Sequence, residues 1–343
     1  MLRFQIRSLR ATLAAMAAAV LALAVPAQAA NPLFPRLYTA DPAVLVDNGR
    51  VYLYVGHDEA APDGKDFVMN EWRVYSSCDL ATWTDHGAVM KAVDFRWAKG
   101  RAWASDIARR VVDGKATYFF YTTVEHATIP GFAVGVASAD SPTGPFKDAR
   151  GSALITNDMT RQTDIAWDDI DPAVFVDDDG QAYLYFGNTV LKYALLKPSM
   201  TALAGPITAV PVKDFTEAPY LHKHGATYYL SYSQHFPEET AYITGPGPTG
   251  PWTPRGVIMA RNEKTPTIHQ AIFDFNGRSY IAYHNAKLPG GGEFRRSVAI
   301  EELHYAPDGT IRFVPQTDAG PAPNPSPGCE GPSRPGAAPS LSG

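Results

Sequence analysis

The stretch DDIDPAVFVDDDGQAYLYFG (Asp168–Gly187) decides the fold, because it contains a strand–turn–strand unit that the chain repeats. Short runs of β-branched and aromatic residues on both sides of a turn with glycine are typical of a β-hairpin. The unit occurs five times, at Ala43–Val55, Ile107–Tyr121, Ala173–Phe186, Tyr220–Tyr232 and Ala271–Tyr283. Its turn glycines are separated by 65, 66, 45 and 52 residues, and they are Gly49, Gly114, Gly180, Gly225 and Gly277.

A second pattern follows several of these hairpins and completes the repeat. It consists of a strand, a turn rich in Ser, Pro and Gly, and then Trp or Phe, as in Val74–Gly87, Val136–Asp148 and Tyr242–Gly256. Five repeats of about four strands each predict an all-β chain folded as a five-bladed β-propeller over residues 31–317. A β-sandwich is the alternative, but it gives no reason for five copies in register.

The composition limits the classes of partner. A formal net charge of −5 and a pI near 6.0 offer no basic face, so we expect no binding to nucleic acid. The chain is rich in aromatic residues, with 17 Tyr, 16 Phe and 6 Trp. Such residues suit strands and also the walls of a groove for a flat, neutral ligand.

The N-terminus predicts a signal peptide over residues 1–29. A basic start with three arginines precedes the apolar run Ala11–Val25, and Ala27-Gln28-Ala29 fits a cleavage site. The apolar run is shorter than the roughly 20 residues that span a bilayer. We therefore expect a secreted or periplasmic protein with no membrane contact after cleavage.

The C-terminal residues 318–343 differ in composition from the rest of the chain. They contain seven of the 29 prolines among Gly, Ala and Ser, which predicts a disordered tail. One of the two cysteines, Cys329, lies in this tail, and the other is Cys78. Export would permit a disulfide between them, but two free thiols fit the sequence equally well.

One ionisable residue precedes each turn glycine at nearly the same distance, eight residues in four repeats and nine in the third. These residues are Asp41, Asp106, Asp171, Glu217 and His269. The first strands of propeller blades line the central axis, so the five side chains should converge at one end of the channel. Gathering them without function would cost several kcal/mol in repulsion and desolvation. The pattern therefore favours acid/base catalysis. The other acidic residues of the opening stretch are out of register: Asp168 and Asp169 are expected at a loop or rim, and Asp177–Asp179 in the hairpin turn.

At these positions the sequence resembles glycoside hydrolase family 43, whose members are inverting five-bladed propeller enzymes that act on xylan and arabinan. The resemblance covers nearly all of the chain after residue 30. It is carried by YTADPAVLVDNGRVYLYVGHDE (Tyr38–Glu59), WASDI (Trp103–Ile107), IDPAVFVDDDGQAYLYFGN (Ile170–Asn188), FTEAPYLHKHGATYYLSYS (Phe215–Ser233), HQAIFDFNGRSYIAYHN (His269–Asn285) and GGGEFRRSVAIEEL (Gly290–Leu303).

The resemblance implies a role for each matching residue. Asp41 would be the general base that activates water, Glu217 the general acid, and Asp171 the residue that orients the acid and raises its pKa. Such a pair of carboxyl groups is what inverting hydrolysis of a glycoside requires. The residues expected to bind the sugar are Trp103, Arg296, Asp106 and His57. Arg295, next to Arg296, is an alternative for the arginine, and Ser105 departs from the proline that the family more often has after Trp-Ala.

The resemblance also implies a candidate structural calcium ion in the central channel, beside His269. No cofactor is expected for the chemistry itself. The expected substrate is an oligosaccharide or polysaccharide from plant cell walls, from which the enzyme would release xylose or arabinofuranose. The oligomeric state cannot be predicted from this sequence.

Three other functions are compatible with a propeller. An endo-acting α-1,5-L-arabinanase of the same family would need an open cleft. A carbohydrate-binding propeller without activity should lack a carboxylate at one of the three catalytic positions, and all three are present. In a retaining fructan-cleaving enzyme, other residues would stand beside those carboxylates in place of Ala40, Ile170 and Ala218.

Overall fold

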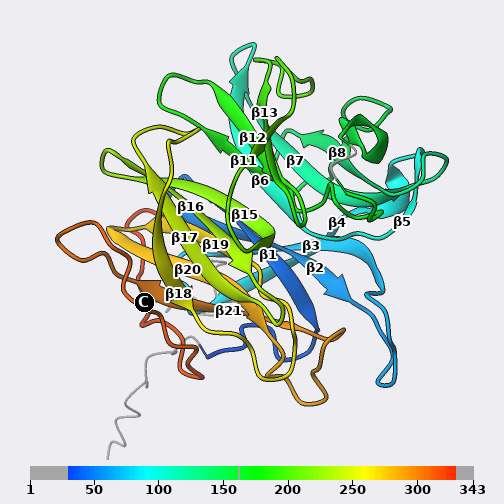
Figure 1. Cartoon of the computed structure of the whole chain (residues 1–343). Coiled ribbons are helices and arrows are strands. Elements are labelled where there is room, and N and C mark those ends of the chain that lie inside the picture. Colours follow the sequence, from blue (N-terminus) through cyan, green and yellow to red (C-terminus); the bar gives the residue numbers. More distant parts are fainter. Residues whose placement is uncertain (1–29, 161–162, 330–343) are drawn as a thin grey trace, which may run out of the picture.

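The computed structural model describes residues 30–160 and 163–329, so the predicted signal peptide lies outside the described residues. The described chain forms five antiparallel sheets arranged around an axis as the blades of a propeller, which confirms the predicted fold (Figure 1). Its two short 3-10 helices are Ala92–Asp94 and Asn157–Met159. No helix in these ranges is long and apolar enough to cross a membrane.

The strands of each blade follow one another in the sequence. The first blade contains β1 (Thr39–Asp47), β2 (Arg50–Asp58), β3 (Met69–Ser77) and β4 (Trp83–Lys91). The second contains β6 (Ser105–Val112), β7 (Lys115–His126), β8 (Phe132–Ala139) and β9 (Lys147–Asp148), with the short strands β5 (Ala98–Gly100) and β10 (Ile155–Thr156) added. The third contains β11 (Ala173–Val176), β12 (Ala182–Phe186), β13 (Leu191–Leu196) and β14 (Thr208–Val210). The fourth contains β15 (Phe215–His224), β16 (Thr227–Gln234), β17 (Glu239–Gly245) and β18 (Thr253–Met259), and the fifth β19 (Gln270–Phe275), β20 (Arg278–Asn285) and β21 (Ser297–Leu303).

The first strands of the blades form the inner wall. β1 contacts β6, β6 contacts β11, β11 contacts β15, β15 contacts β19, and β19 contacts β1, so the ring of inner strands is closed (Figure 1). Each inner strand pairs with the next strand through the hairpin that the sequence predicted. Three of these hairpins turn at Asn-Gly or Asp-Gly with positive φ at both residues, namely Asn48-Gly49, Asp113-Gly114 and Asn276-Gly277. Such turns match the twist of the two strands.

The apolar core is divided among the five interfaces between neighbouring blades. Tyr54, Trp72 and Phe120, for example, pack between the first and second blades and are fully buried. Similar clusters fill the other four interfaces. Because each blade buries both faces, the strands are apolar on both sides, which explains why the hairpins contain runs of apolar residues rather than strict alternation.

The fifth blade has three strands, and the start of the described chain covers its open edge. The backbone N–H of Leu33 donates to the carbonyl of Val298 in β21 at 2.9 Å. Asn31 bonds both the N–H and the carbonyl of Ile300 through its side chain. The segment before β1 therefore takes the place of a fourth strand and joins the first blade to the last.

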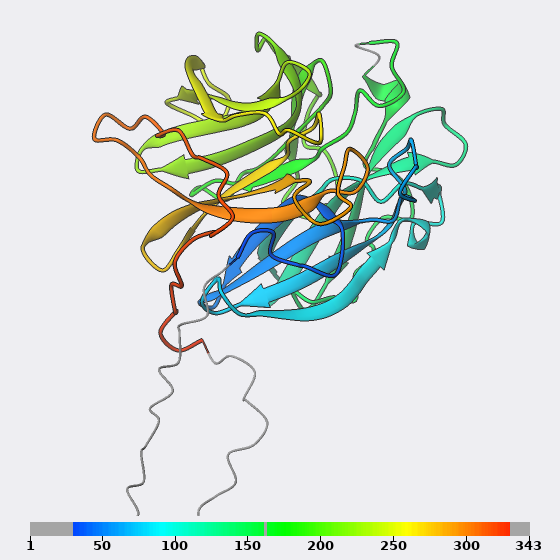
Figure 2. The ribbon, with the colours of Figure 1, turned by 90° about the horizontal axis from the view of Figure 1, so that it is seen from below.

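The segment 318–329 does not match the predicted disordered tail. Asn324 is buried. Its backbone N–H donates to the carbonyl of Asp79, just after β3 of the first blade, and its side chain donates to the carbonyl of Phe275 in the fifth blade. Cys329 forms a disulfide with Cys78, which settles the alternative that the sequence left open. In Figure 2 this red segment runs from the fifth blade toward the blue first blade. Proline-rich composition misled the prediction, because the segment is held by hydrogen bonds and a covalent link rather than by its own core. Residues 330–343 lie outside the described residues.

Candidate active site

Three carboxyl groups stand where the inner strands are irregular. The pairing of β1 with β2 shifts between Ala40 and Ala43, and that of β15 with β16 shifts on both sides of Glu217. Asp41 and Asp171 have φ values of 52° and 59°, in the left-handed region that aspartate tolerates better than most residues. A proline follows near each carboxylate and cannot donate to the ladder. Bulges of this kind redirect side chains, here toward the end of the channel.

The redirected carboxyl groups border one cavity of about 420 Å³. Six of the eight predicted site residues line it, namely Asp41, Asp171, Glu217, Trp103, His269 and Arg296. Apolar and aromatic side chains supply much of the remaining wall, including Phe67, Met69, Ile170, Trp167 and Phe236. A cavity with a few polar groups among apolar walls is typical of a small-molecule or sugar site.

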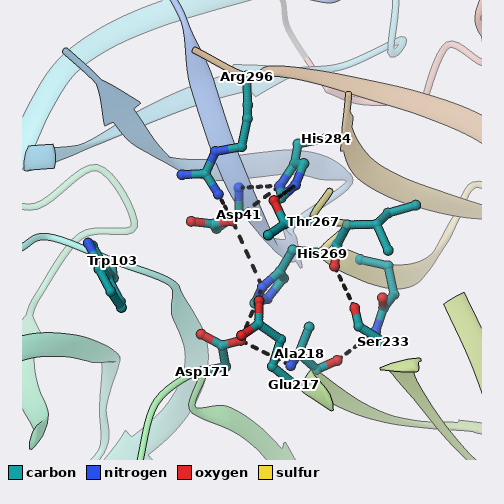
Figure 3. A network of polar contacts seen from close by, with 12 residues as sticks. Asp41, Trp103, Asp171, Glu217, Ala218, Ser233, Thr267, His269, His284 and Arg296 are labelled. Carbon is teal, nitrogen blue, oxygen red and sulfur yellow. Dashed lines mark hydrogen bonds and ion pairs between the residues drawn. The ribbon is translucent and has the colours of Figure 1, made fainter. Parts of the chain in front are cut away.

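Asp41 is held as an anion. Its Oδ1 lies 3.0 Å from Nη1 of Arg296 and 3.1 Å from Nδ1 of His284 (Figure 3). Burial alone would raise the pKa of Asp41, but the charge of Arg296 and the hydrogen bond with His284 outweigh it, so the pKa lies below its ordinary value. An ionised carboxylate at the cavity wall can accept a proton from water.

Arg296 is fixed by a second carboxylate. Its Nε donates to Oδ2 of Asp58 at 2.9 Å and its Nη2 to Oδ1 at 2.8 Å, and the guanidinium lies 4.7 Å over the ring of Phe67. Both Arg296 and Asp58 are buried. This bidentate pair fixes the guanidinium against Asp41. Of the two candidate arginines, Arg296 lines the cavity, whereas the guanidinium of Arg295 lies 5.2 Å from the ring centre of Tyr38.

Glu217 and Asp171 have the opposite electrostatic setting. Oε2 of Glu217 accepts from Nδ2 of Asn188 at 2.7 Å, and Oδ2 of Asp171 accepts from the N–H of Ala218 at 3.0 Å. Burial raises the pKa of Glu217, the hydrogen bond from Asn188 opposes this, and the charge of Asp41 raises the pKa further. Burial and the charge of Glu217 raise the pKa of Asp171 well above its ordinary value. This side of the cavity therefore retains a proton more readily than Asp41.

The residues and the fold together agree with one family of proteins. The family model of glycosyl hydrolases family 43 matches residues 29–311. The chain belongs to glycosyl hydrolases family 43.

Relatives in this family differ in length and in their named substrates. An arabinoxylan arabinofuranohydrolase of Bacillus subtilis (strain 168) is 33% identical over 84% of this chain, which spans 65% of the length of that protein. A xylosidase/arabinosidase of Bacteroides ovatus is 32% identical over 83% of this chain and 98% of its own length. The crystal structure of a β-xylosidase/α-arabinofuranosidase from a compost microbial metagenome, in complex with xylotriose and in a calcium-free form, has a TM-score of 0.75 and 31% identity, covering 84% of this chain and 98% of its own.

Two predicted site residues of this family 43 chain lie away from the cavity wall. Oδ2 of Asp106 accepts from the N–H of Val174 at 2.7 Å, and the residue thereby joins the second and third blades. Burial raises the pKa of Asp106 to about 7. His57 is half-buried beside Glu71, with Nδ1 3.2 Å from its Oε1. Neither residue lines the cavity, so the prediction that they bind substrate is not supported by their positions. Register along the strand was correct for Asp106, but β6 lacks the bulge that turns Asp41 and Glu217 into the cavity.

His269 lies between two carboxylates rather than in a cluster of metal ligands. Its Nδ1 is 3.7 Å from Oδ2 of Asp171 and 4.0 Å from Oδ1 of Asp41 (Figure 3). Burial lowers its pKa to about 4, so the imidazole is neutral near pH 7. Within residues 30–160 and 163–329, no three His, Cys, Asp or Glu side chains are arranged to hold a metal. Calcium takes six to eight oxygen ligands, so a calcium ion beside His269 would need backbone or water oxygens as well, and this site stays a prediction.

Several residues of the site were not found from the sequence. Asp58 and His284 stand inside the family motifs, and their ionisable side chains within apolar strands were the available signal. Asn188, Glu238, Trp167 and Phe236 lie on loops between strands, where no periodic pattern marks them.

The two aspartates expected at a rim are buried instead. Asp168 and Asp169 are 1% and 0% exposed, and both lie beside the fully buried Lys192. Nζ of Lys192 donates to Oδ1 of Asp169 at 2.9 Å and to the carbonyl of Asp168 at 2.7 Å. This buried ion pair fixes the chain next to Trp167, whose side chain reaches the cavity. The correction follows from a lysine on β13, whose position in space the sequence does not show.

Proposed function

We propose that this protein is an inverting glycoside hydrolase that releases xylose or arabinofuranose from oligosaccharides derived from plant-cell-wall xylan and arabinan. One observation carries the proposal. Within one cavity, the carboxyl group of Asp41 has a lowered pKa and that of Glu217 a raised pKa. A pair of carboxyl groups with such opposite pKa shifts supplies both the base and the acid of glycoside hydrolysis near neutral pH.

The two groups would act on opposite sides of the sugar. Glu217 gives its proton to the oxygen of the leaving group while the bond from that oxygen to the anomeric carbon breaks. Asp41 takes a proton from the water whose oxygen forms the new bond to the same carbon. The two residues belong to the first and fourth blades, which are not neighbours, and this leaves space between them for sugar and water. Asp171 accepts a hydrogen bond from the N–H of Ala218, next to Glu217, and would orient the acid, while repulsion between the two carboxylates would disfavour their joint ionisation.

The walls of the cavity suit a pentose ring. Trp103 stacks on Phe132 with a centroid distance of 4.2 Å, and Phe67 contacts both Trp103 and Phe294 edge to face, so these rings form a rigid wall. Aromatic faces bind the apolar side of a sugar, while Arg296 can donate to its hydroxyl groups. Trp167 and Phe236 line the cavity and remain 44% and 68% exposed, and we expect them to contact the leaving group. The names of the relatives, arabinofuranohydrolase and xylosidase/arabinosidase, support this class of substrate.

Export is part of the proposal. The predicted signal peptide leads to a secreted or periplasmic protein. The disulfide between Cys78 and Cys329 supports it, because such bonds persist mainly in oxidising compartments.

A hydrolysis panel tests the function. It should include an aryl β-xyloside, an aryl α-arabinofuranoside, xylo-oligosaccharides, arabinoxylan oligosaccharides and linear arabinan, with the anomer of the first product followed by NMR. We expect release of a single pentose with inverted configuration. A retained anomer would refute the mechanism. Release of internal oligosaccharides from arabinan would instead support an endo-acting arabinanase, and activity on none of the substrates would favour a carbohydrate-binding protein.

A further inference from the structure

A fourth carboxyl group, that of Glu238, lines the cavity beside Glu217. Glu238 precedes β17 and is 1% exposed. Its Oε2 accepts from the N–H of Ile268 at 2.8 Å, and its own N–H donates to the carbonyl of Pro266 at 2.7 Å. These bonds hold the side chain in place from the loop before the fifth blade.

Glu238 has an acidic partner instead of a basic one. Its carboxyl group shares a side-chain hydrogen bond with that of Glu217, and the charges of Glu217 and Asp171 both raise the pKa of Glu238. Glu217 in turn faces Asp41 and, more weakly, Arg296, and its Oε2 accepts from Asn188. In the described chain no Lys, Arg or His forms an ion pair with Glu238. A buried carboxylate without a cation is costly, whereas a protonated one is not.

Two carboxyl groups can hydrogen-bond to one another only when at least one of them carries a proton, because an ionised carboxylate is an acceptor alone. We propose that Glu217 and Glu238 form a carboxyl pair that holds one shared proton, and that Glu238 is a positioning residue that keeps this proton available for the leaving group. The inference rests on the proposed function of Glu217 as the general acid.

The shared proton has a measurable consequence. Removing it leaves two adjacent negative charges in a buried site, so the pair should lose it only at a higher pH than Glu217 alone would. Burial and the charge of Glu217 raise the pKa of Glu238 well above its ordinary value, whereas the hydrogen bond from Glu238 lowers the pKa of Glu217, so Glu238 holds the shared proton more strongly of the two. The alkaline limb of the pH–rate profile should therefore belong to the pair rather than to one residue.

The test compares wild type with Glu238→Gln. Glutamine keeps an oxygen for the N–H of Ile268 and can donate its amide to Glu217, which would stabilise the ionised form of the acid. We expect the alkaline limb of kcat/KM for xylobiose, or for the oligosaccharide that the panel selects, to move down by about one pH unit or more. Near pH 8 the variant should then lose roughly tenfold relative to wild type. The loss on an aryl glycoside with a good leaving group should be far smaller.

Two further variants separate this role from a structural one. Glu239→Gln changes the neighbouring residue, whose carboxylate bonds Gln234 and His235 outside the cavity, and it should leave the limb in place. Glu238→Asp keeps a carboxyl group and should give a limb closer to that of wild type, which also keeps the test informative if the glutamine variant fails to fold.

The outcomes distinguish the inference from the function on which it rests. If wild type is active and the limbs of Glu238→Gln and wild type coincide, the shared proton is refuted while the proposed function stands. Equal losses on both substrates at every pH would also overturn it, since they would indicate a structural defect. If wild type hydrolyses no glycoside in the panel, the proposed function fails, and the role of Glu238 fails with it.

Discussion

Replacing Arg296 with methionine should move the acidic limb of the pH–rate profile to higher pH. Burial raises the pKa of Asp41, and the charge of Arg296 is the strongest influence that lowers it. Methionine fills similar apolar space beside Met69 but removes the positive charge 3.0 Å from Oδ1 of Asp41. The general base should then be protonated, and inactive, at pH values where wild type is fully active.

The distance sets the size of the effect. Two unit charges 3.0 Å apart interact by about 5 kcal/mol at an effective dielectric constant of about 20. At 1.36 kcal/mol per pKa unit this corresponds to an upper limit of about four units. His284 stays 3.1 Å from the same oxygen, and water entering the space of the guanidinium will reduce the loss. We therefore expect a rise of about two units or more in the pKa of Asp41.

The assay is kcat/KM for an aryl glycoside with a good leaving group between about pH 3 and 8, because the acid then contributes little. Arg296→Lys keeps a positive charge and should show a smaller shift in the acidic limb, and KM should rise for both variants through lost contacts with sugar hydroxyls. Arg295→Met is the matched control, since the guanidinium of Arg295 lies over the ring of Tyr38, whereas the ion pair with Asp41 is made by Arg296. Thermal unfolding should be followed as well, because Asp58 loses its partner. An acidic limb of Arg296→Met that coincides with that of wild type would refute the assignment of Asp41 as the base.

Four other predictions concern the site and the fold. Glu217→Ala should lose about 10²- to 10⁴-fold on xylobiose but much less on an aryl glycoside with a good leaving group, and equal loss on both would contradict its role as acid. Asp41→Ala, in contrast, should abolish activity on both. Trp167→Ala should raise KM for oligosaccharides more than for aryl glycosides, since the exposed ring lines the cavity and is proposed to contact the leaving group; unchanged KM values would exclude that contact. Cys78→Ser should lower the free energy of unfolding by up to about 5 kcal/mol, because the bond closes a loop between residues 251 apart, and denaturant curves that match wild type under oxidising conditions would contradict this.

The fold could be predicted because the repeat is local. Each hairpin declares itself within about fifteen residues through its glycine turn and its aromatic second strand, and register along these hairpins gave the inner positions of Asp41, Asp171, Glu217 and His269. The same register placed Asp106 in the inner ring, but its side chain does not line the cavity. A bulge changes the direction of a side chain by shifting the pairing of two strands, and the sequence of one strand does not show that shift.

Contacts between distant segments were beyond reach for a different reason. Lys192 pairs with Asp169 across 23 residues, and Asn324 reaches the turn of the fifth blade across 49. Such pairs depend on how blades and loops pack, and many partners would be equally reasonable from the sequence alone. The acidic run of the third repeat illustrates the limit. The turn at Asp177–Asp179 was recognised from its glycine, whereas Asp168 and Asp169 looked like solvent-exposed loop and proved to neutralise a buried lysine.

Which carboxyl group acts as the base and which as the acid depends on the position of Arg296. Burial raises the pKa of every carboxyl group in it, and it is the largest influence on Asp41, Asp171, Glu217 and Glu238 alike. Arg296, fixed by Asp58, contacts Asp41 alone among these four and reverses the effect of burial there. The other three carboxyl groups therefore keep raised pKa values and retain protons at a pH at which Asp41 is ionised. Moving the guanidinium to the side of Glu217 would leave the same residues in the same cavity but exchange the base and the acid.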